Sequence, residues 1–401
     1  MRIARTSFNF IALLAALAAL DFAGHCVAGQ PKKGPVKVFI MAGQSNMDGQ
    51  ADVRTIDFLG EDKDPARAAL IKTFKPDGKN FVTRDDVWVA TGSVYDKLQT
   101  GYGGRKDYTK LGHCIGPEYA FGYYMGEALD EQVLLIKYGP GGTSLLTSWR
   151  PPSAGPTGNA KLDEAELDAA TVEKWFKGHK GKVVGCQYRY LVDYVRDTLA
   201  NLKKHFPDYD EKAGYEIAGF VWFQGYNDLG CAKEEYSKCL VCLIKDLRAE
   251  FKSPEMKAVV GVLGVNGVKN EGGKQVGVRE GQRFINTVPE LKGNAKAIES
   301  APLLHPEVVA LMTAGWLNDR DTKKNPITPE ERAMLQRATS NKGFHYYGEG
   351  RFFILLGKAF ADTMLELMGE GSKVMPPKLN AFAPPGAQVN PAVPARKKKG
   401  A

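Results

Sequence analysis

The sequence predicts an α/β fold, a three-layer α/β/α sandwich built on a central, mainly parallel sheet of five strands. Two observations favour it: five short, nearly continuous apolar runs have strand length, and amphipathic helical patterns separate them. Strands that are apolar on both faces are typical of a parallel sheet covered by helices on both sides. About 340 residues remain once the two chain ends are set aside, enough for one large domain with a sizeable core.

The order of these segments gives the expected elements. The five strands are expected at Val36–Ala42, Val133–Tyr138, Ile217–Gln224, Lys257–Val265 and Val308–Thr313. The helices are expected at Pro117–Leu129, Tyr188–His205, Ala232–Phe251, Lys274–Thr287, Pro329–Ala338 and Gly348–Met368. Two stretches, about 48–110 and 151–185, break the alternation and are interpreted as insertions in a domain spanning 33–370. Loops of that length usually carry function or cover a site.

The first 28 residues have the pattern of an export signal. Arg2 and Arg5 form a basic start, Ile11–Leu20 is almost entirely leucine and alanine, and Cys26-Val27-Ala28 fits a small-residue cleavage site. The apolar run is too short to span a bilayer, so we expect no stable membrane insertion after cleavage. The sequence therefore predicts an exported protein, periplasmic, cell-surface or secreted, with an uncleaved membrane anchor as the alternative.

The formal charge of +8 is concentrated at the chain ends. Residues 1–28 carry a net charge of +1 and residues 371–401 carry +6, which leaves about +1 for the body. A nearly neutral body gives no indication of nucleic-acid binding. Residues 371–401 are rich in proline and alanine as well as basic, so we expect them to form a disordered tail.

The cysteines do not have the spacing of a metal site. Cys239 and Cys242 form a C-x-x-C, but they lie in an expected helix and no second pair or histidine cluster accompanies them. We therefore expect no metal. In an exported protein a disulfide could form among the cysteines of the body, although the pairing cannot be deduced from the sequence.

Ser45 directly follows the first expected strand, where a helix should begin. Ligands in open α/β sheets bind beyond the carboxyl ends of the strands. Gly142 and the pair Gln224 and Asn227 follow the second and third strands, so these residues should meet Ser45 at one edge. The backbone N–H groups of Ser45 and Gly142, with a side-chain amide from Asn227 or Gln224, would stabilise an oxyanion formed when the serine attacks a carbonyl.

His345 lies in a loop just before the last expected helix, where it could accept the proton of the serine hydroxyl. Each residue taken singly also has an ordinary structural role. Ser45 and Asn227 could be helix caps, Gly142 a turn residue and His345 a packed histidine. Found together at strand ends in this order, they indicate acyl transfer with no cofactor.

These motifs resemble those of the SGNH hydrolases, which have a flavodoxin-like fold. Within them the chain is most similar to the sialate O-acetylesterase-type domain of carbohydrate esterase family six. The resemblance covers roughly residues 36–368. It is carried by Gly43-Gln44-Ser45-Asn46-Met47, by Gly141-Gly142-Thr143-Ser144-Leu145 with Trp149, by Trp222-Phe223-Gln224-Gly225-Tyr226-Asn227-Asp228 and by His345-Tyr346-Tyr347-Gly348. It implies Ser45 as nucleophile and His345 as general base.

One position departs from the family pattern. The family has an aspartate three residues before the histidine, and Lys342 occupies that position here. An acid normally fixes the imidazole tautomer and stabilises the imidazolium. Either Ser45 and His345 act as a dyad whose ring is oriented by a backbone carbonyl, or another acid substitutes. The candidate acids are Asp228, Asp319, Asp321 and Glu349.

The function implied by the resemblance is removal of acetyl groups from carbohydrate, namely sialic acid, acetylxylan or a related glycan. Two alternatives stay open: an esterase or lipase of the same superfamily acting on other acyl esters, and a carbohydrate-binding homologue with weakened catalysis. Some aromatic residues are candidates for stacking on sugar faces or for ordinary core: Trp88, Tyr95, Tyr102, Trp149 and Trp175.

Overall fold

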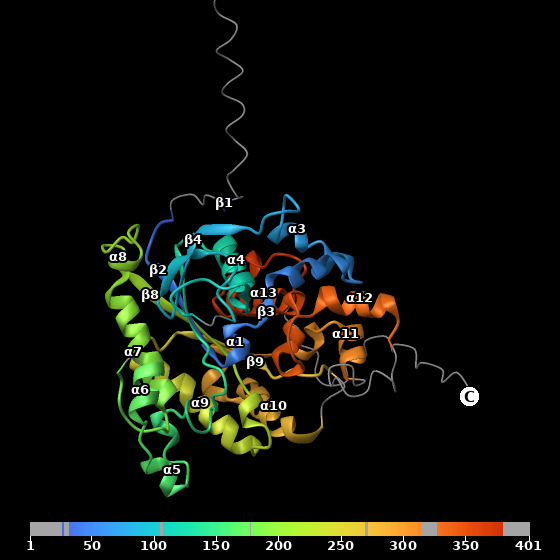
Figure 1. Cartoon of the computed structure of the whole chain (residues 1–401). Helices are drawn as coiled ribbons and strands as arrows, with labels where there is room; N and C mark the ends of the chain where they lie inside the picture. The colour runs from blue at the N-terminus through green and yellow to red at the C-terminus, as the bar shows by residue number, and fades with distance from the viewer. Residues whose placement is uncertain are drawn as a thin grey trace, which may run out of the picture.

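A central, mainly parallel sheet runs through the molecule (Figure 1). The computed structural model describes residues 26–27, 32–104, 107–176, 178–268, 272–313 and 327–379. Seven strands follow one another across the sheet: β1 (Cys26–Val27), β4 (Thr83–Thr91), β7 (Val133–Tyr138), β2 (Val36–Gly43), β8 (Tyr215–Phe223), β9 (Lys257–Val262) and β10 (Ala295–Glu299). All neighbouring pairs on this path are parallel, and β5 (Val94–Leu98) pairs antiparallel with β4.

Helices cover both faces of the sheet, as a three-layer sandwich requires. One face is covered by α4 (Glu118–Ala128) and α13 (Gly350–Leu367), and the other by α7 (Cys186–Ala200), α9 (Lys233–Glu250) and α10 (Val276–Arg283) (Figure 1). Successive residues of β8 show the division, because side chains alternate between the faces of a strand. The Phe223 ring lies 5.9 Å from that of Phe360 in α13, whereas the Trp222 ring lies 5.2 Å from Trp149 on the other face.

Shorter elements complete the domain. They are α1 (Ser45–Asp48), β3 (Ala51–Asp52), α2 (Pro65–Ala68), α3 (Ile71–Phe74), β6 (Cys114–Ile115), α5 (Ala160–Glu164), α6 (Ala169–Phe176), α8 (Leu202–His205), α11 (Pro306–Leu311) and α12 (Pro329–Ala338). The strands β3 and β6 form a separate antiparallel pair. None of the helices in the described ranges is long and apolar enough to cross a membrane.

The α/β class is confirmed, but the expected number of five strands is wrong. Four expected strands are present as β2, β7, β8 and β9, whereas Val308–Thr313 lies mostly within the helix α11. Pro306 occupies the first turn of that helix, a position for which its fixed φ is well suited. The strand on that side of the sheet is instead β10, whose sequence AKAIE is short and partly polar.

The segment 48–110 supplies part of the central sheet in addition to loops. Its strand β4 pairs in parallel with β7 along Val87–Ala90, and β4 continues into β5 through a short turn. Gly92 in that turn has a φ of +65°, a left-handed conformation that glycine adopts without a steric penalty. The segment 151–185 contains the short helices α5 and α6 and an isolated bridge between Glu166 and Lys182.

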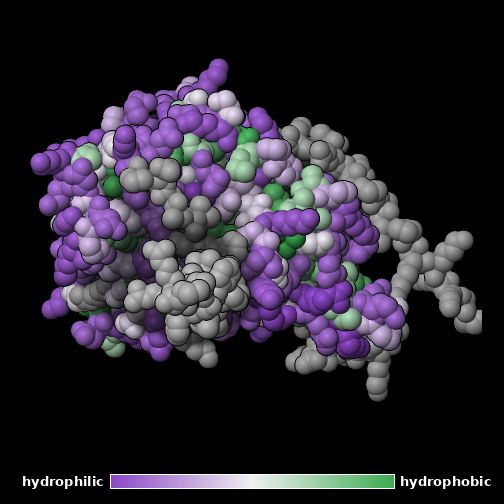
Figure 2. Space-filling view, turned by 90° about the horizontal axis from the view of Figure 1, so that it is seen from above, coloured by the Kyte–Doolittle hydropathy of each residue, from purple (hydrophilic) through white to green (hydrophobic). Residues whose placement is uncertain are grey.

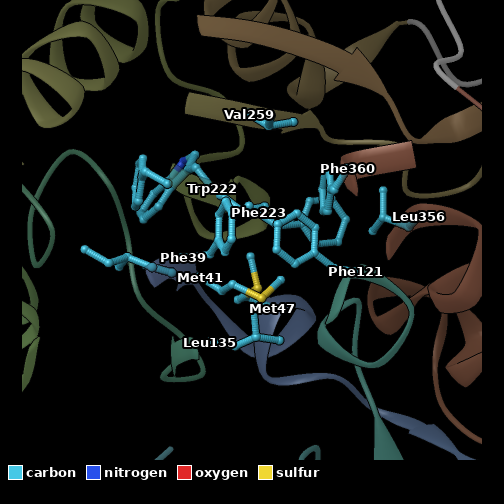
Figure 3. Packing of buried hydrophobic residues seen from close by; sticks show 14 of the residues in the cluster. Phe39, Met41, Met47, Phe121, Leu135, Trp222, Phe223, Val259, Leu356 and Phe360 are labelled. Carbon is cyan, nitrogen blue, oxygen red and sulfur yellow. The ribbon is translucent and has the colours of Figure 1, made fainter. Parts of the chain in front are cut away.

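The core lies between the sheet and the helices on each face. Figure 3 shows side chains from β2, β8, α4 and α13 in one hydrophobic cluster, with Met47 of α1 among them. Burial of Met47 fixes the turn that follows β2 to the core. The face seen in Figure 2 is mostly hydrophilic, and its apolar residues form small separate areas.

Residues 371–379 pack against α13, although the sequence analysis assigned them to a disordered tail. Lys358 and Asp362 form a buried ion pair one helical turn apart. The Lys358 ammonium donates to the carbonyl of Met375, and the Leu379 N–H donates to the Asp362 carboxylate at 2.8 Å. These contacts make residues 371–379 part of the domain. The rest of the expected tail, and the expected signal apart from Cys26 and Val27, lie outside the described residues.

Candidate active site

Ser45 is the first residue of α1 and directly follows β2 at the centre of the sheet. The neighbours of β2 are β7 on one side and β8 on the other, so Ser45 lies where the chain changes its direction of winding across the sheet. Ligands bind at such switch points in open α/β sheets. Ser45 is partly exposed, whereas Asn46, Met47 and Asp48 of the same turn are buried.

The turn that carries Ser45 passes very close to its neighbours. A Cβ placed on Gly43 would lie 2.1 Å from the carbonyl oxygen of Phe223, and one on Gly139 would lie 2.4 Å from the amide nitrogen of Asp48. Side chains cannot be accommodated at those distances, so both positions require glycine. The two glycines bring the ends of β7 and β8 against α1.

A buried lysine fixes the other end of α1. The Lys137 ammonium, at the carboxyl end of β7, donates to the carbonyl oxygen of Asp48 at 2.7 Å and to that of Tyr102 at 3.1 Å. It also forms an ion pair of 2.7 Å with Glu118, and both side chains are almost completely buried. Each donor and acceptor is therefore paired, which a buried charge requires.

The imidazole ring of His345 is within hydrogen-bonding distance of the Ser45 hydroxyl, as expected from the sequence. Its Nε2 is 3.0 Å from the Ser45 Oγ, and its Nδ1 is 3.1 Å from the Oδ1 of Asn341. The residue that orients the ring is therefore Asn341, four positions before the histidine, and not an acid. Asn341 was not among the residues selected from the sequence, because asparagine in a polar turn gives no signal that distinguishes it from a turn residue.

The hydrogen bonds of Asn341 define the tautomer of His345. The backbone N–H of Lys342 donates to the Asn341 Oδ1 at 2.8 Å, so this atom is the amide oxygen. An oxygen accepts from the ring, and Nδ1 must therefore carry the proton. The Nε2 lone pair then faces the Ser45 hydroxyl, which is the arrangement that a general base needs.

The loop that carries His345 has an unusual backbone. Tyr346 and Tyr347 both adopt left-handed conformations, with φ of +51° and +60°, at a cost of about 1 to 3 kcal/mol each for residues other than glycine. The Tyr346 ring is fully buried and stacks on Phe352 at 4.1 Å, and its hydroxyl accepts from the Gly264 N–H at 3.0 Å. This packing stabilises the strained turn and so fixes the histidine.

Burial lowers the pKa of His345 to about 4. Desolvation disfavours the charged imidazolium, and the ring makes no carboxylate contact in the described part of the chain that would counteract this effect. The site therefore holds a neutral imidazole over the neutral pH range. A further link joins the two segments, because the Asn46 Nδ2 donates to the carbonyl of Phe344 at 3.0 Å.

Asp228 does not orient His345. Its carboxylate accepts from the Ser144 hydroxyl, from the backbone N–H of Leu145 at 2.8 Å and from the Gln224 amide. Burial raises the pKa of Asp228, and these donors oppose that shift. Asp228 therefore holds the glycine turn after β7 against the loop after β8.

Glu349 is also engaged away from the site. It is fully buried, forms an ion pair with Arg351 at 3.2 Å and accepts a long hydrogen bond from the backbone N–H of His305. Burial raises the pKa of Glu349 to about 7. The two remaining candidate acids, Asp319 and Asp321, lie outside the described residues.

Of the expected oxyanion donors, Gln224 is used elsewhere. Its Nε2 donates to the Thr143 carbonyl at 3.0 Å and to Asp228, and this interaction leaves no amide hydrogen for an oxyanion. Asn227 is exposed, and its Oδ1 accepts a hydrogen bond from the Gln44 Nε2 at 3.0 Å. This bond uses the oxygen of the Asn227 amide and holds the side chain in place. Gly142 is exposed as well, with a φ of +74°. Asn227 and Gly142 remain as candidate donors beside the Ser45 N–H.

The structure places no metal-binding cluster of histidine, cysteine or acidic residues in its described ranges. Among the described side chains, five cysteines are free thiols: Cys114, Cys186, Cys231, Cys239 and Cys242. Four of the five aromatic residues considered as sugar platforms are engaged in packing: Trp88 stacks on Phe206, Tyr95 stacks on His205, and Tyr102 and Trp149 are fully buried. Trp175 is the exception and is exposed.

Comparison with known proteins gives one family and several distant structures. Residues 35–305 match the family described as carbohydrate esterase, sialic acid-specific acetylesterase. The matched range includes Ser45, Gly142 and Asn227 and ends before His345. No curated protein matches the chain.

Solved structures that resemble the chain have low sequence identity. A protein of Arabidopsis thaliana is 16% identical over 83% of this chain and 98% of its own, with a TM-score of 0.44. NanS is 12% identical over 84% and 99%, with a TM-score of 0.45. A carbohydrate acetylesterase from Xanthomonas citri is 13% identical over 67% and 51%, with a TM-score of 0.37. The family match, and not these structures, identifies the chain.

Proposed function

Because the chain belongs to the sialic acid-specific acetylesterase family of carbohydrate esterases, we propose that it removes O-acetyl groups from carbohydrate through an acyl-enzyme on Ser45. The observation that carries the proposal is the contact of 3.0 Å between the Ser45 Oγ and the Nε2 of His345. The tautomer fixed by Asn341 supports it, because the lone pair of Nε2 faces the hydroxyl proton.

In the first half of the reaction the Ser45 Oγ attacks the acetyl carbonyl carbon while its proton passes to the Nε2 of His345. The carbonyl π electrons move onto oxygen, and the N–H groups of Ser45 and Gly142 and the side-chain amide of Asn227 stabilise that oxyanion. The tetrahedral intermediate then collapses. The bond between the acetyl carbon and the sugar oxygen breaks, and His345 returns its proton to the departing sugar hydroxyl.

In the second half, water takes the place of the serine hydroxyl. His345 accepts a proton from water as the water oxygen adds to the acetyl carbon of the acyl-enzyme. When this second tetrahedral intermediate collapses, the bond between the acetyl carbon and the Ser45 Oγ breaks and His345 returns its proton to Oγ, which releases acetate and restores the serine hydroxyl. Asn341 acts in both halves by holding the ring. An uncharged amide stabilises the imidazolium less than a carboxylate would, so the enzyme depends more heavily on its oxyanion donors.

Acetate release tests the proposal and identifies the sugar. The wild-type protein is incubated with O-acetylated sialic acids, acetylxylan and acetylated pectin, and acetate is measured against Ser45→Ala. We expect release from at least one substrate, reduced by more than about a thousandfold in the variant. Equal release by both proteins would remove Ser45 from the mechanism. A preference for long-chain over short-chain p-nitrophenyl esters would exclude an acetylesterase.

Export is proposed from residues 1–28. Their basic start, short apolar run and small-residue site support cleavage after Ala28. Expression of the full chain in the native host, followed by cell fractionation and N-terminal sequencing, tests this. An intact N-terminus on an intracellular protein would contradict it.

A further inference from the structure

We propose that a cavity next to the nucleophile binds a second sugar ring of the glycan, an inference that rests on the proposed esterase function. The cavity has a volume of about 580 Å³. Pockets that enclose a drug-sized ligand have volumes of about 300 to 1,000 Å³, so this one far exceeds the needs of an acetyl group.

The cavity is adjacent to Ser45. The turn Gly139-Pro140-Gly141, which follows β7, lines the cavity, and a Cβ placed on Gly141 would lie 3.7 Å from the Cβ of Ser45. A glycan whose acetyl ester lies at Ser45 therefore needs to extend only across one glycine to enter the cavity.

Both segments that interrupt the expected alternation contribute walls. Thr91, Ser93 and Tyr108 come from the first, and the helix α6 with Trp175 comes from the second. Figure 1 shows α6 beside α7, and the ring of Phe176 in α6 packs edge-on against Tyr190 of α7 at 5.7 Å. The parts of the chain where long loops were expected to cover a site therefore supply about half of the cavity lining, and the turn after β7 and the helix α7 supply most of the rest.

The walls have the chemistry of a sugar site. Six of the lining side chains are aromatic: Tyr108, Tyr138, Trp175, Phe176, Tyr190 and Tyr194. An aromatic face is electron-rich, and the C–H groups on the apolar face of a pyranose carry partial positive charge, so the two attract each other. Trp175 is 53% exposed and Tyr108 is 41% exposed, values that leave ring surface available to a ligand.

Polar groups among the rings suit the hydroxyls of a sugar. The amide oxygen of Gln187 accepts a hydrogen bond from the Tyr138 hydroxyl, which fixes the amide and leaves its nitrogen as the donor. The hydroxyls of Ser93 and Thr171 also line the cavity. Leu167 is the one branched aliphatic residue of the lining. A long acyl chain would find few aliphatic partners there, and this difference favours a sugar ring as the occupant.

The test separates sugar binding from chemistry. Trp175→Ala removes the most exposed ring, and Tyr215→Ala is the matched control, because Tyr215 is 45% exposed at the amino end of β8, away from the site. KM and kcat are measured for two pairs: O-acetylated sialic acid with O-acetylated sialyllactose, and acetylated xylose with acetylated xylotriose. p-Nitrophenyl acetate reports the chemistry alone.

We expect a lower KM for the trisaccharide of at least one pair in the wild type. Trp175→Ala should raise that KM about three- to tenfold, since one aromatic contact contributes about 0.5 to 1.5 kcal/mol. The kinetics with p-nitrophenyl acetate, and all kinetics of Tyr215→Ala, should be unchanged. Equal KM values within both pairs would overturn the proposal. So would a Trp175→Ala variant whose larger loss is on p-nitrophenyl decanoate, because an acyl chain would then occupy the cavity.

Calorimetry distinguishes failure of this proposal from failure of the proposed function. Sialyllactose and xylotriose, without acetyl groups, are titrated into Ser45→Ala with and without Trp175→Ala. If one of these glycans binds and Trp175→Ala weakens that binding, the proposed sugar site is supported even when no acetate is released. Absence of binding of both at millimolar concentration overturns the cavity, whereas wild-type hydrolysis that does not depend on Ser45 overturns the proposed function.

Discussion

Replacing Asn341 by aspartate should raise both the pKa of His345 and the catalytic rate. The Nδ1 of His345 lies 3.1 Å from the Oδ1 of Asn341, and Asn341→Asp would place a carboxylate oxygen there. The backbone N–H of Lys342 donates to the same atom and would continue to do so. The hydrogen-bonding geometry is therefore kept, and only the charge changes.

The magnitude follows from the distance. Two unit charges about 4 Å apart at an effective dielectric constant of about 20 attract by about 4 kcal/mol. Desolvation of the new carboxylate offsets part of this, so we expect a net rise of about 1 to 2 pKa units, equivalent to about 1.4 to 2.7 kcal/mol. If about half of that energy is realised in the transition state, kcat rises about three- to tenfold.

The pH dependence gives the assay. In the proposed mechanism His345 acts in its neutral form, so wild-type activity should be lost only as pH falls through the pKa of about 4. In Asn341→Asp the acidic limb of kcat/KM for p-nitrophenyl acetate should move upward by the same 1 to 2 pKa units. Lys342→Gln is the matched control, since it lowers the net charge by one unit at an exposed neighbouring position. The reasoning is refuted if Asn341→Asp and Lys342→Gln give the same limb, or if Asn341→Asp lowers kcat.

Three further substitutions test the oxyanion donors, a buried ion pair and a buried histidine. Asn227→Ala should lower kcat by about 10²- to 10³-fold with little change in KM, measured on p-nitrophenyl acetate; an unchanged kcat would exclude this donor. Lys137→Met should lower the unfolding free energy in urea by about 3 to 5 kcal/mol, because it leaves Glu118 buried and unpaired, and Glu118→Gln in the same chain should restore much of the loss. Burial lowers the pKa of His305 to about 4, below its value in the unfolded chain. Between about pH 6.5 and pH 4 the unfolded chain therefore binds a proton that the folded protein does not. The free energy of unfolding should fall over that range by up to about 1.4 kcal/mol per pH unit. His305→Leu should flatten the fall of melting temperature over that range, and a slope equal to that of the wild type would contradict this account.

The parts of the fold predicted from the sequence are those whose local pattern agrees with their burial. Strand β7 spans Val133–Tyr138 and helix α12 spans Pro329–Ala338, both as expected. Among the strands that were missed, β4 and β10 have weaker patterns. β10 alternates alanine with Lys296 and ends at Glu299, and β4 begins with charged residues, so neither resembles a strand buried on both faces. Their pairing with β9 and β7 depends on the rest of the sheet.

The site residues likewise divide into those that a local sequence pattern predicts and those that depend on the three-dimensional structure. Ser45 and His345 could be selected because strand ends and a late histidine have a chemical meaning in this type of fold. Asn341 could not be selected, because the turn formed by Tyr346 and Tyr347 determines which side chain reaches the ring. The sequence alone does not indicate that two tyrosines adopt left-handed backbone conformations. Gln224 and Asn227 are both amides in one loop. The partners that each one finds in three dimensions decide which of them is left to donate.

The position of His345 on the chain also determines when the site can first form. Ser45 and His345 are 300 residues apart, and the bond between Asn46 and Phe344 spans 298 residues. During synthesis Ser45, the glycine turn and Asn227 all emerge long before His345, and α13, which packs against α4 and follows the histidine loop, is the last α-helix in the described part of the chain. A nascent or prematurely terminated chain that lacks His345 thus carries Ser45 without the proton acceptor of the proposed mechanism. Under the proposed mechanism, hydrolytic activity begins only after His345 and α13 have been synthesised and have packed against the rest of the domain, so a chain that ends before them is inactive.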